Sequence, residues 1–306
     1  MTTRAVLSVL VATAIVLWLA ASALAAFPGR NGLIAFDRSK GGVSDIWVLD
    51  PKSGKETDVT RTPRIFEREA AFSPDGRTIA FAWQDYVDNR YGIGVIGSDG
   101  RGMRHLVSGD WFIDEPAWTA DGRTVVFSAR SDEEIGQSIW AVAASGGPAR
   151  RLTFGGDDGS DRFPLGSPDG RHIAYLHDDF LDPPAELIAE PSGQDPMLAA
   201  GQAASDWSPD GGRFVYESRH AIYASAIDGS GELKLADLPT VDEDPAFSPD
   251  GKWVVWTNEG THDLWLVPAA GGRPRNLTRQ VGFEHDPSWG RAVTVKQRKP
   301  RRHHRS

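Results

Sequence analysis

The chain has 306 residues, a formal net charge of −9, 33 glycines, 20 prolines, 11 tryptophans and no cysteine. The lack of cysteine excludes disulfides and thiolate-bound metals, and the acidic charge argues against nucleic-acid binding by the body of the chain. Many short apolar runs between glycine and proline turns favour an all-β fold over helical bundles or βαβ units.

The first 26 residues are interpreted as a targeting segment. Arg4 is their only charged side chain, and a mostly apolar run follows from Ala5 to Ala26. Ala23-Leu24-Ala25 fits the small-x-small pattern that signal peptidase recognises, so we expect cleavage after Ala25. The alternative is an uncleaved N-terminal anchor, because the run is long enough to span a bilayer. Both alternatives predict an extracytoplasmic protein, whether periplasmic, secreted or tethered to the outer face of a membrane.

One motif recurs within residues 27–290. It consists of an aromatic strand end, a Ser-Pro-Asp-Gly turn and a second apolar strand, as in Phe247–Gly251 before Trp253–Trp256. Related copies begin at Phe72, Trp118, Ser167 and Trp207. Proline presets φ, aspartate bonds nearby backbone N–H groups, and glycine accepts positive φ, so each copy predicts a hairpin turn.

The motif has a regular period. The second strands end at intervals of 40–48 residues, at Phe36, Phe81, Phe127, Tyr175, Tyr216 and Trp256. A third strand such as Asp45–Leu49 and a fourth, edge-like strand such as Arg150–Thr153 complete each unit. This period is typical of four-stranded propeller blades, so we predict an all-β, six-bladed β-propeller of antiparallel blades.

The two ends of the repeat complement each other. The first unit starts at Gly32 without a preceding inner strand, whereas Asp286–Gly290 is an inner strand without a unit. We therefore predict that the C-terminal strand closes the first blade and leaves no open sheet at the seam. Residues 291–306 hold seven Lys or Arg and two His, and we interpret them as a basic disordered tail.

The repeated order of aromatic-Ser-Pro-Asp-Gly, Ile-Ala-Phe, Ile-Trp-Val, Gly-Gly and Arg-Leu-Thr resembles the WD40-like repeat of TolB-type β-propellers over about residues 28–290. In TolB an α/β domain precedes the propeller, whereas here we expect the propeller to start directly after the targeting segment. The resemblance also extends to propellers that serve as regulatory modules of prolyl-oligopeptidase-like peptidases and to some lyases. The sequence contains no Gly-x-Ser-x-Gly nucleophile elbow.

The candidate site follows from the strand period. Side chains one and three positions before the proline of each inner strand share a face, which we expect to line the central channel. The candidate ligand-binding residues at or beside these positions are Glu67, Glu69, Glu115, Asp161, Asp242, Asp244, Glu284, His285 and Asp286. They predict an electronegative channel mouth suited to a cation, an amine or a basic peptide segment. The alternative is that the acids are solvated turn residues that bond backbone amides and that His285 is a surface histidine.

Our first hypothesis is a monomeric scaffold in the cell envelope that binds a protein or peptide partner at the channel mouth. It includes no enzyme activity, since no catalytic constellation is visible, and no cofactor, although a channel-bound cation such as calcium would fit. Membrane contact is expected only if the N-terminal segment stays uncleaved.

Two other hypotheses stay open. The first is a metal-assisted polysaccharide lyase or hydrolase with its site in the channel. It requires two or more of His172, His177, His262 and His285 to meet at a channel carboxylate. The second is a structural envelope protein tethered by the N-terminal run and the basic tail.

Overall fold

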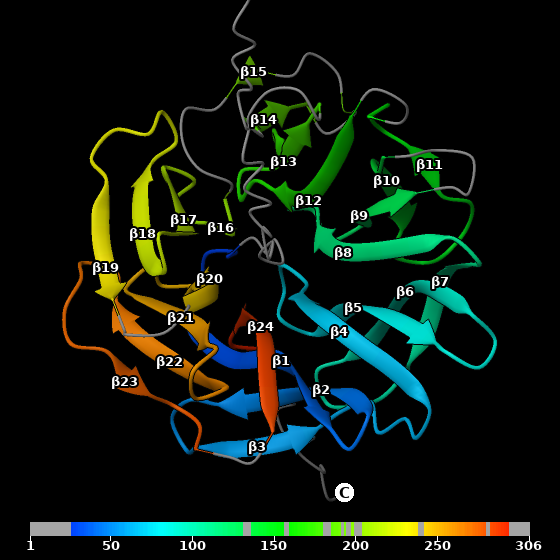
Figure 1. Ribbon diagram of the computed structural model, residues 1–306, viewed down its shortest axis with the longest axis horizontal. Helices are drawn as coiled ribbons and strands as arrows, with labels where there is room; N and C mark the ends of the chain where they lie inside the picture. The colour runs from blue at the N-terminus through cyan, green and yellow to red at the C-terminus, as the bar shows by residue number, and fades with distance from the viewer. Residues whose placement is uncertain are drawn as a thin grey trace, which may run out of the picture.

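The computed structural model describes residues 26–130, 136–155, 159–179, 185–190, 193, 197–198, 204–237, 242–279 and 282–293. The predicted targeting segment up to residue 25 and the tail from residue 294 lie outside this part of the chain. The described residues form 24 strands, arranged radially around a central axis (Figure 1). Within them, no helix has the length and apolar character needed to cross a membrane.

The chain begins with two sets of four strands. The first set is β1 (Asn31–Lys40), β2 (Val43–Asp50), β3 (Lys55–Asp58) and, from the end of the chain, β24 (Phe283–Arg291). The second is β4 (Ile65–Phe72), β5 (Thr78–Asp85), β6 (Arg90–Gly97) and β7 (Arg104–Gly109). One parallel bridge between Ser44 and Phe66 joins the two sets, so by hydrogen bonding they form one eight-stranded sheet.

Four further sheets have four strands each. They are β8 (Phe112–Trp118), β9 (Thr124–Arg130), β10 (Ser138–Ala143) and β11 (Arg150–Arg151); β12 (Ser160–Gly166), β13 (Ile173–Asp178), β14 (Ala185–Ala189) and β15 (Met197–Leu198); β16 (Asp206–Trp207), β17 (Arg213–Ser218), β18 (Ala221–Ala226) and β19 (Leu233–Asp237); and β20 (Asp242–Phe247), β21 (Trp253–Asn258), β22 (Asp263–Pro268) and β23 (Arg275–Asn276). The prediction of an all-β propeller of antiparallel sheets is confirmed. A count of six blades treats the two sets of the eight-stranded sheet as separate.

The predicted closure of the ring is also confirmed. β24 pairs antiparallel with β1, and Trp289 lies opposite Ile34. Trp289 is buried in one apolar cluster with Phe36. The C-terminal strand therefore supplies the innermost strand of the first sheet and covers an edge that would otherwise stay unpaired.

The repeated turns have the contacts that their sequence predicts. In the last copy, the Ser248 hydroxyl donates to Asp250 Oδ1 at 2.7 Å, and the backbone N–H of Lys252 donates to the same oxygen at 3.1 Å. Gly251 has a φ of 69°, which glycine adopts without steric cost. The aspartates at positions 75, 121, 169 and 210 make the equivalent contacts. The repeated aspartates thus stabilise the scaffold.

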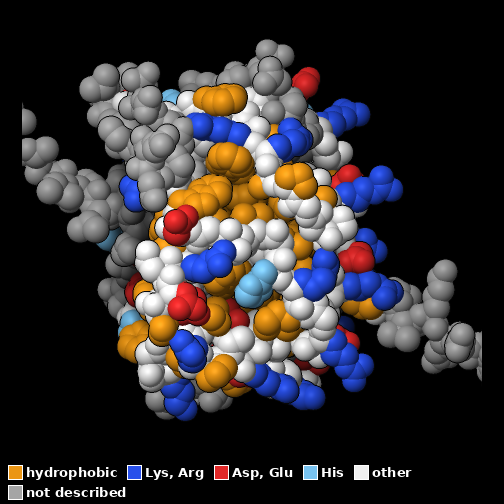
Figure 2. Space-filling model, turned by 90° about the vertical axis from the view of Figure 1, so that its right-hand side faces the viewer, with side chains coloured by type: hydrophobic (Ala, Val, Ile, Leu, Met, Phe, Trp, Pro, Cys, Tyr) orange, Lys and Arg blue, Asp and Glu red, His pale blue; other side chains and the backbone are white. Residues whose placement is uncertain are grey.

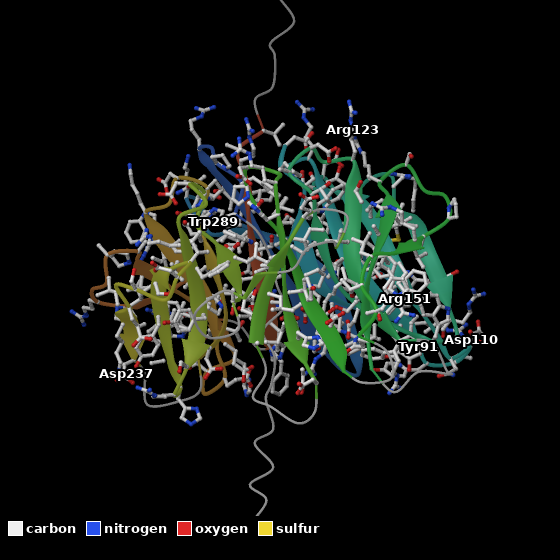
Figure 3. All side chains as sticks on the ribbon, turned by 90° about the horizontal axis from the view of Figure 1, so that it is seen from above. Tyr91, Asp110, Arg123, Arg151, Asp237 and Trp289 are labelled. Carbon is white, nitrogen blue, oxygen red and sulfur yellow. The ribbon has the colours of Figure 1, made fainter. Side chains whose placement is uncertain are left out.

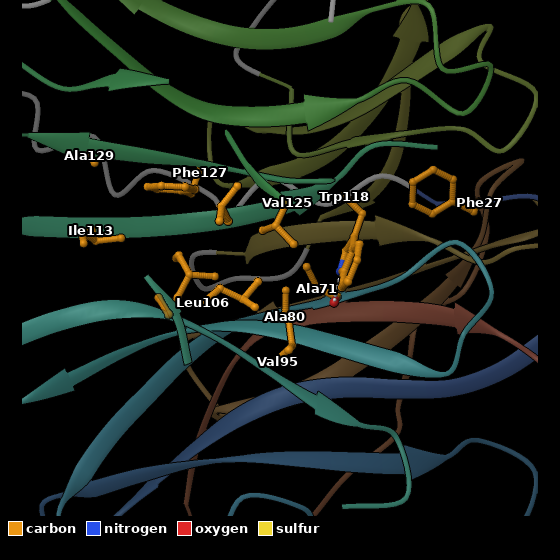
Figure 4. Packing of buried hydrophobic residues seen from close by; sticks show 13 residues of the cluster. Phe27, Ala71, Ala80, Val95, Leu106, Ile113, Trp118, Val125, Phe127 and Ala129 are labelled. Atoms are coloured by element: carbon orange, nitrogen blue, oxygen red, sulfur yellow. Dashed lines mark hydrogen bonds between the residues drawn. The ribbon is translucent and has the colours of Figure 1, made fainter. Parts of the chain in front are cut away.

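The core lies between neighbouring sheets. In one cluster, Ala71 and Ala80 of the second set face Trp118, Val125 and other side chains of the β8–β11 sheet (Figure 4). On the outer surface to the right of Figure 1, basic side chains are scattered among apolar ones (Figure 2). In the core, each apolar side chain that is fully buried between two sheets contributes about 1.5–3 kcal/mol to the free energy of folding. This packing stabilises the arrangement of neighbouring sheets.

The disc has two distinct ends. Figure 3 shows it from the side, with Arg123, which follows a Pro-Asp-Gly-type turn, at one end and Asp110 and Asp237 toward the other. We call the first the turn end and the second the opposite end. The innermost strands start at the opposite end and run to the turn end.

Candidate functional site at the opposite end of the axis

Five innermost strands share one backbone irregularity. A non-glycine residue has a φ of 52° to 56° at the point where pairing with the next strand skips. These residues are Glu69, Glu115, Phe163, Asp244 and Asp286. Left-handed backbone costs a non-glycine residue about 1–2 kcal/mol, so its recurrence requires a compensating contact.

Carboxylates of the preceding four-stranded unit supply that contact in three of the strands, where the two sets of the eight-stranded sheet count as two units. The backbone N–H of Glu69 donates to Asp37 Oδ1 at 3.3 Å, and that of Glu115 donates to Glu69 Oε2 at 2.7 Å. The N–H of Phe163 in turn donates to Glu115 Oε2 at 2.8 Å. Glu69 and Glu115 are 9% and 6% exposed. These side chains therefore connect neighbouring units. The alternative that the acids bond backbone amides is correct for them, but they are buried and not solvated as that alternative expected.

Three acids two positions earlier in these strands, Glu67, Asp161 and Glu284, are buried as well. Glu67 accepts a hydrogen bond from Thr62 Oγ1 at 3.1 Å, and burial raises its pKa to about 8. Glu284 accepts hydrogen bonds from Arg38 Nε at 3.1 Å and from the hydroxyl of Thr278. Asp161 contacts His177 Nδ1 at 2.6 Å.

The predicted site residues are thus divided by the fold. The acids Glu67, Glu69, Glu115, Asp161, Asp244 and Glu284 are buried, whereas His285 and Asp286 are half-buried. The backbone of Asp242 pairs with Asn258, and the burial of its side chain lies outside the described features. The bulge adds one residue to each of these strands and breaks the simple alternation of faces from which the channel-facing positions were predicted. The ligand-binding role of these residues stays a prediction.

The residue directly before each bulge is ionisable in all five strands. These residues are Arg68, Asp114, Arg162, Glu243 and His285. Arg68 Nη2 lies 2.9 Å from Asp114 Oδ1, and Arg162 Nη2 lies 3.3 Å from Asp178 Oδ2. Sequence reasoning singled out only His285 of this set, because it assumed an unbroken alternation.

His285 is the centre of the remaining charges. Its Nδ1 lies 3.3 Å from Glu259 Oε1, and Asp37 lies opposite it in the β1–β24 pairing. Burial lowers the pKa of His285, but the contact with Glu259 and the charges of Asp37 and Asp286 outweigh burial and raise it to about 9. The imidazole is therefore protonated at neutral pH.

Two more groups complete the cluster. His262 Nδ1 lies 3.9 Å from Glu259 Oε2, so Glu259 stands between two histidines. Burial and the nearby Glu259 and Glu217 raise the pKa of Glu243 to about 7. The repeat period predicts that β24 pairs with β1, and this pairing could have predicted that Asp37 lies near His285. Glu259 lies in the β21–β22 turn, and no sequence pattern indicated its approach to His285.

The described side chains include no group of three or more His, Asp or Glu arranged to hold a metal ion. A separate His–carboxylate pair, His177–Asp161, lies where β12 begins and β13 ends. It is therefore at the same end of the disc as His285, on a different sheet.

Two residues at the start of the described chain pack near the turn end of the axis. Phe27 packs in the cluster of Trp118 and Ala71 (Figure 4), and Ala26 packs against Phe247 and other residues of the sheets β16–β19 and β20–β23. A cavity of about 620 Å³ opens nearby, lined by charges of both signs that include Asp99, Arg77 and Arg291. The acidic cluster around Glu259 is therefore remote from this cavity.

The fold has a solved counterpart. A crystal structure of TolB from Acinetobacter baumannii matches with a TM-score of 0.71 and 19% sequence identity, over 87% of this chain and 68% of that one. The chain has a TolB-like β-propeller fold. No family model matches it.

The TolB-like propeller also has relatives among peptidases. It is 28% identical over 169 residues to the uncharacterized peptidase YuxL of Bacillus subtilis, covering 50% of this chain and 24% of the relative. It is 28% identical over 280 residues to tricorn protease homolog 1 of Streptomyces coelicolor, covering 86% of this chain and 25% of the relative. The chain therefore spans about a quarter of the length of these two relatives.

These relatives correct one expectation. The prediction that the chain is not an enzyme, made because no catalytic constellation was visible, is contradicted by its similarity to peptidases. The expectation depended on a local sequence motif, whereas side chains from distant parts of the chain, such as Glu259 and His285, meet only in the folded ring.

Proposed function

We propose that this chain is an exported six-bladed TolB-like propeller that acts as a scaffold in the cell envelope and binds a protein or peptide segment at the opposite end of its axis. The six blades count the two sets of the eight-stranded sheet separately, across their single bridge. The similarity to TolB supports the scaffold, and the apolar N-terminal run supports export.

The observation that carries the proposal is the excess of carboxylates around His285. Glu243, Glu259 and Asp286 lie within one electrostatic environment, with His285 as their nearby cation. The pKa of Glu243 is raised to about 7, first by burial and then by the charges of Glu259 and Glu217. A basic side chain placed there would relieve this repulsion and favour the charged form of Glu243. Ala26 and Phe27 pack into the apolar clusters near the turn end, and the proposal places the partner at the opposite end, where the carboxylates gather.

A labelled oligo-lysine peptide tests this proposal. We expect the Glu243→Gln variant to bind it at least about 3-fold more weakly at pH 8, because one carboxylate is lost from a partly buried site. Asp99→Asn, at the turn-end cavity, is the matched control and should bind as tightly as the unmodified chain. Equal affinity of all three proteins, or an equal loss in both variants, contradicts the proposal.

A second candidate function is catalytic. His262 and His285 both approach Glu259, so two of the four candidate histidines meet at one carboxylate, which lies in the β21–β22 turn rather than on an innermost strand. Glu243 and His285 have pKa values of about 7 and about 9, and groups with such separated values suit general base and general acid roles. The peptidase relatives support this candidate, although they are about four times longer than the matched region.

Turnover assays separate the two candidates. The exported protein is incubated with unstructured peptides and with acidic polysaccharides, with and without added calcium or manganese. The catalytic candidate predicts product formation that falls at least about 100-fold in both His285→Gln and Glu259→Gln. No turnover by the unmodified chain under any of these conditions refutes it and leaves the binding proposal intact.

A further inference from the structure

A buried carboxylate far from the His285 cluster holds the start of the described chain. Asp206 begins β16 and is 1% exposed. Its Oδ1 accepts a hydrogen bond from the backbone N of Ala26 at 2.7 Å, and its Oδ2 accepts one from the backbone N–H of Phe247 at 2.6 Å. Burial raises the pKa of Asp206 well above its usual value, against the opposing effect of these backbone donors. A buried carboxyl without a cation is costly to ionise.

Ala26 is buried, as Asp206 is. It is 3% exposed, and its side chain lies in the apolar cluster of Val215, Phe247 and Trp256. The next residue, Phe27, packs on the other side of the axis against Trp118. The N–H of Gly29 donates to the carbonyl of Pro249 at 2.9 Å. The nitrogen of Ala26 therefore has a defined position beside Asp206.

The sequence places the expected signal-peptidase cut after Ala25, directly before this nitrogen. We propose that Ala26 is the first residue of the mature protein and that its new α-ammonium group forms a buried ion pair with Asp206. Cleavage replaces an amide N–H by a cation at a position where a buried carboxylate already accepts a hydrogen bond. Asp206 is then ionised and paired, and the ammonium group has its charge balanced.

Removal of the targeting segment would then change the charge beside Asp206. The precursor has a neutral amide beside Asp206, whereas the mature chain has a cation there, so the two forms differ in the stability of the closed ring. Removing one partner of such a pair leaves an unpaired buried charge, which destabilises the fold. The ion pair therefore stabilises the mature fold specifically.

The test uses the full-length precursor, exported by a bacterial host and purified after processing. The mass of the intact product should correspond to a chain that starts at Ala26. Its α-amine should react at least about 10-fold more slowly with an amine-selective reagent at pH 7 than the α-amine of a matched variant, because a buried, paired ammonium is inaccessible and protonated. In that variant, Ser-Gly is inserted between Ala25 and Ala26, which keeps the Ala26 amide but moves the amine outward.

Stability gives an independent readout. Asp206→Asn should lower the Tm of the normally processed chain by about 5 °C or more. The same substitution should have a clearly smaller effect when the Ser-Gly insertion is present, because the ammonium is already displaced. A product that retains residues 1–25 or starts elsewhere, or an α-amine that reacts as fast as in the insertion variant, overturns the proposal. The mass and labelling results decide it even if Asp206→Asn does not fold.

Discussion

Replacing Glu115 by glutamine should make the protein more stable at neutral pH. Burial and the charge of Glu69 raise the pKa of Glu115 to about 8 in the folded protein, from 4.5 as its ordinary value. The folded state therefore holds the proton more strongly than the unfolded chain. The stability that protonation provides is complete below about pH 4.5 and is lost as the pH rises toward about 8. At pH 7 the loss amounts to about 3 kcal/mol, at about 1.4 kcal/mol for each unit of pKa difference.

Glutamine does not titrate, and its amide oxygen can accept the same hydrogen bonds from Ser128 Oγ and the Phe163 N–H. We expect the free energy of unfolding of Glu115→Gln to exceed that of the unmodified protein by about 1–3 kcal/mol at pH 7, and the gain to shrink toward pH 5. Urea unfolding between pH 5 and 8 measures the gain in the free energy of unfolding and its change with pH. Glu115→Ala is the control and should be less stable at every pH, since it leaves two buried donors unpaired. A difference between glutamine and glutamate that stays constant from pH 5 to 8 refutes the reasoning.

Three further predictions address the seam and the histidine cluster. Arg38→Ala leaves the buried Glu284 without its cation, so urea unfolding should show a loss of about 3–5 kcal/mol, and a loss below about 1 kcal/mol contradicts the assignment. Trp289→Ala should cost about 3–5 kcal/mol by opening the ring closure, more than Trp253→Ala at a half-buried site; similar values for both argue against a special role of the seam. In an NMR titration His285 should stay protonated to about pH 9, and Glu259→Gln should lower this midpoint; a midpoint near 6.5 in the unmodified protein is incompatible with the cluster.

Local signals in the sequence predicted much of the fold. The Ser-Pro-Asp-Gly turns are decided by a few adjacent residues, and the phase of Trp289 was sufficient to predict its pairing with β1. The fourth strands β11 and β23 are shorter than expected. β11 ends at Arg151 because the hydroxyl of Thr153 accepts the Ile139 N–H at 2.9 Å, a contact that replaces strand pairing.

The candidate site was harder to predict for a physical reason. The prediction assumed that successive side chains point to opposite faces of the strand. A residue with left-handed backbone, such as Glu115, breaks this alternation, and its amino-acid type gives no sign of the backbone conformation. Contacts between distant residues carry no local pattern either. Ala26 and Asp206, 180 positions apart, are an example, as are Glu259 and His285.

The pairing of β24 with β1 has a consequence for biosynthesis. Strand β1 is synthesised before β2 to β23, whereas its neighbour Trp289 in β24 follows all of them. One side of the first sheet therefore stays unpaired until the other sheets have been made. Contacts of such long sequence separation slow folding. A product truncated before β24 would keep this unpaired edge exposed and would be prone to aggregation, so the ring becomes protected only when its final strand has been made.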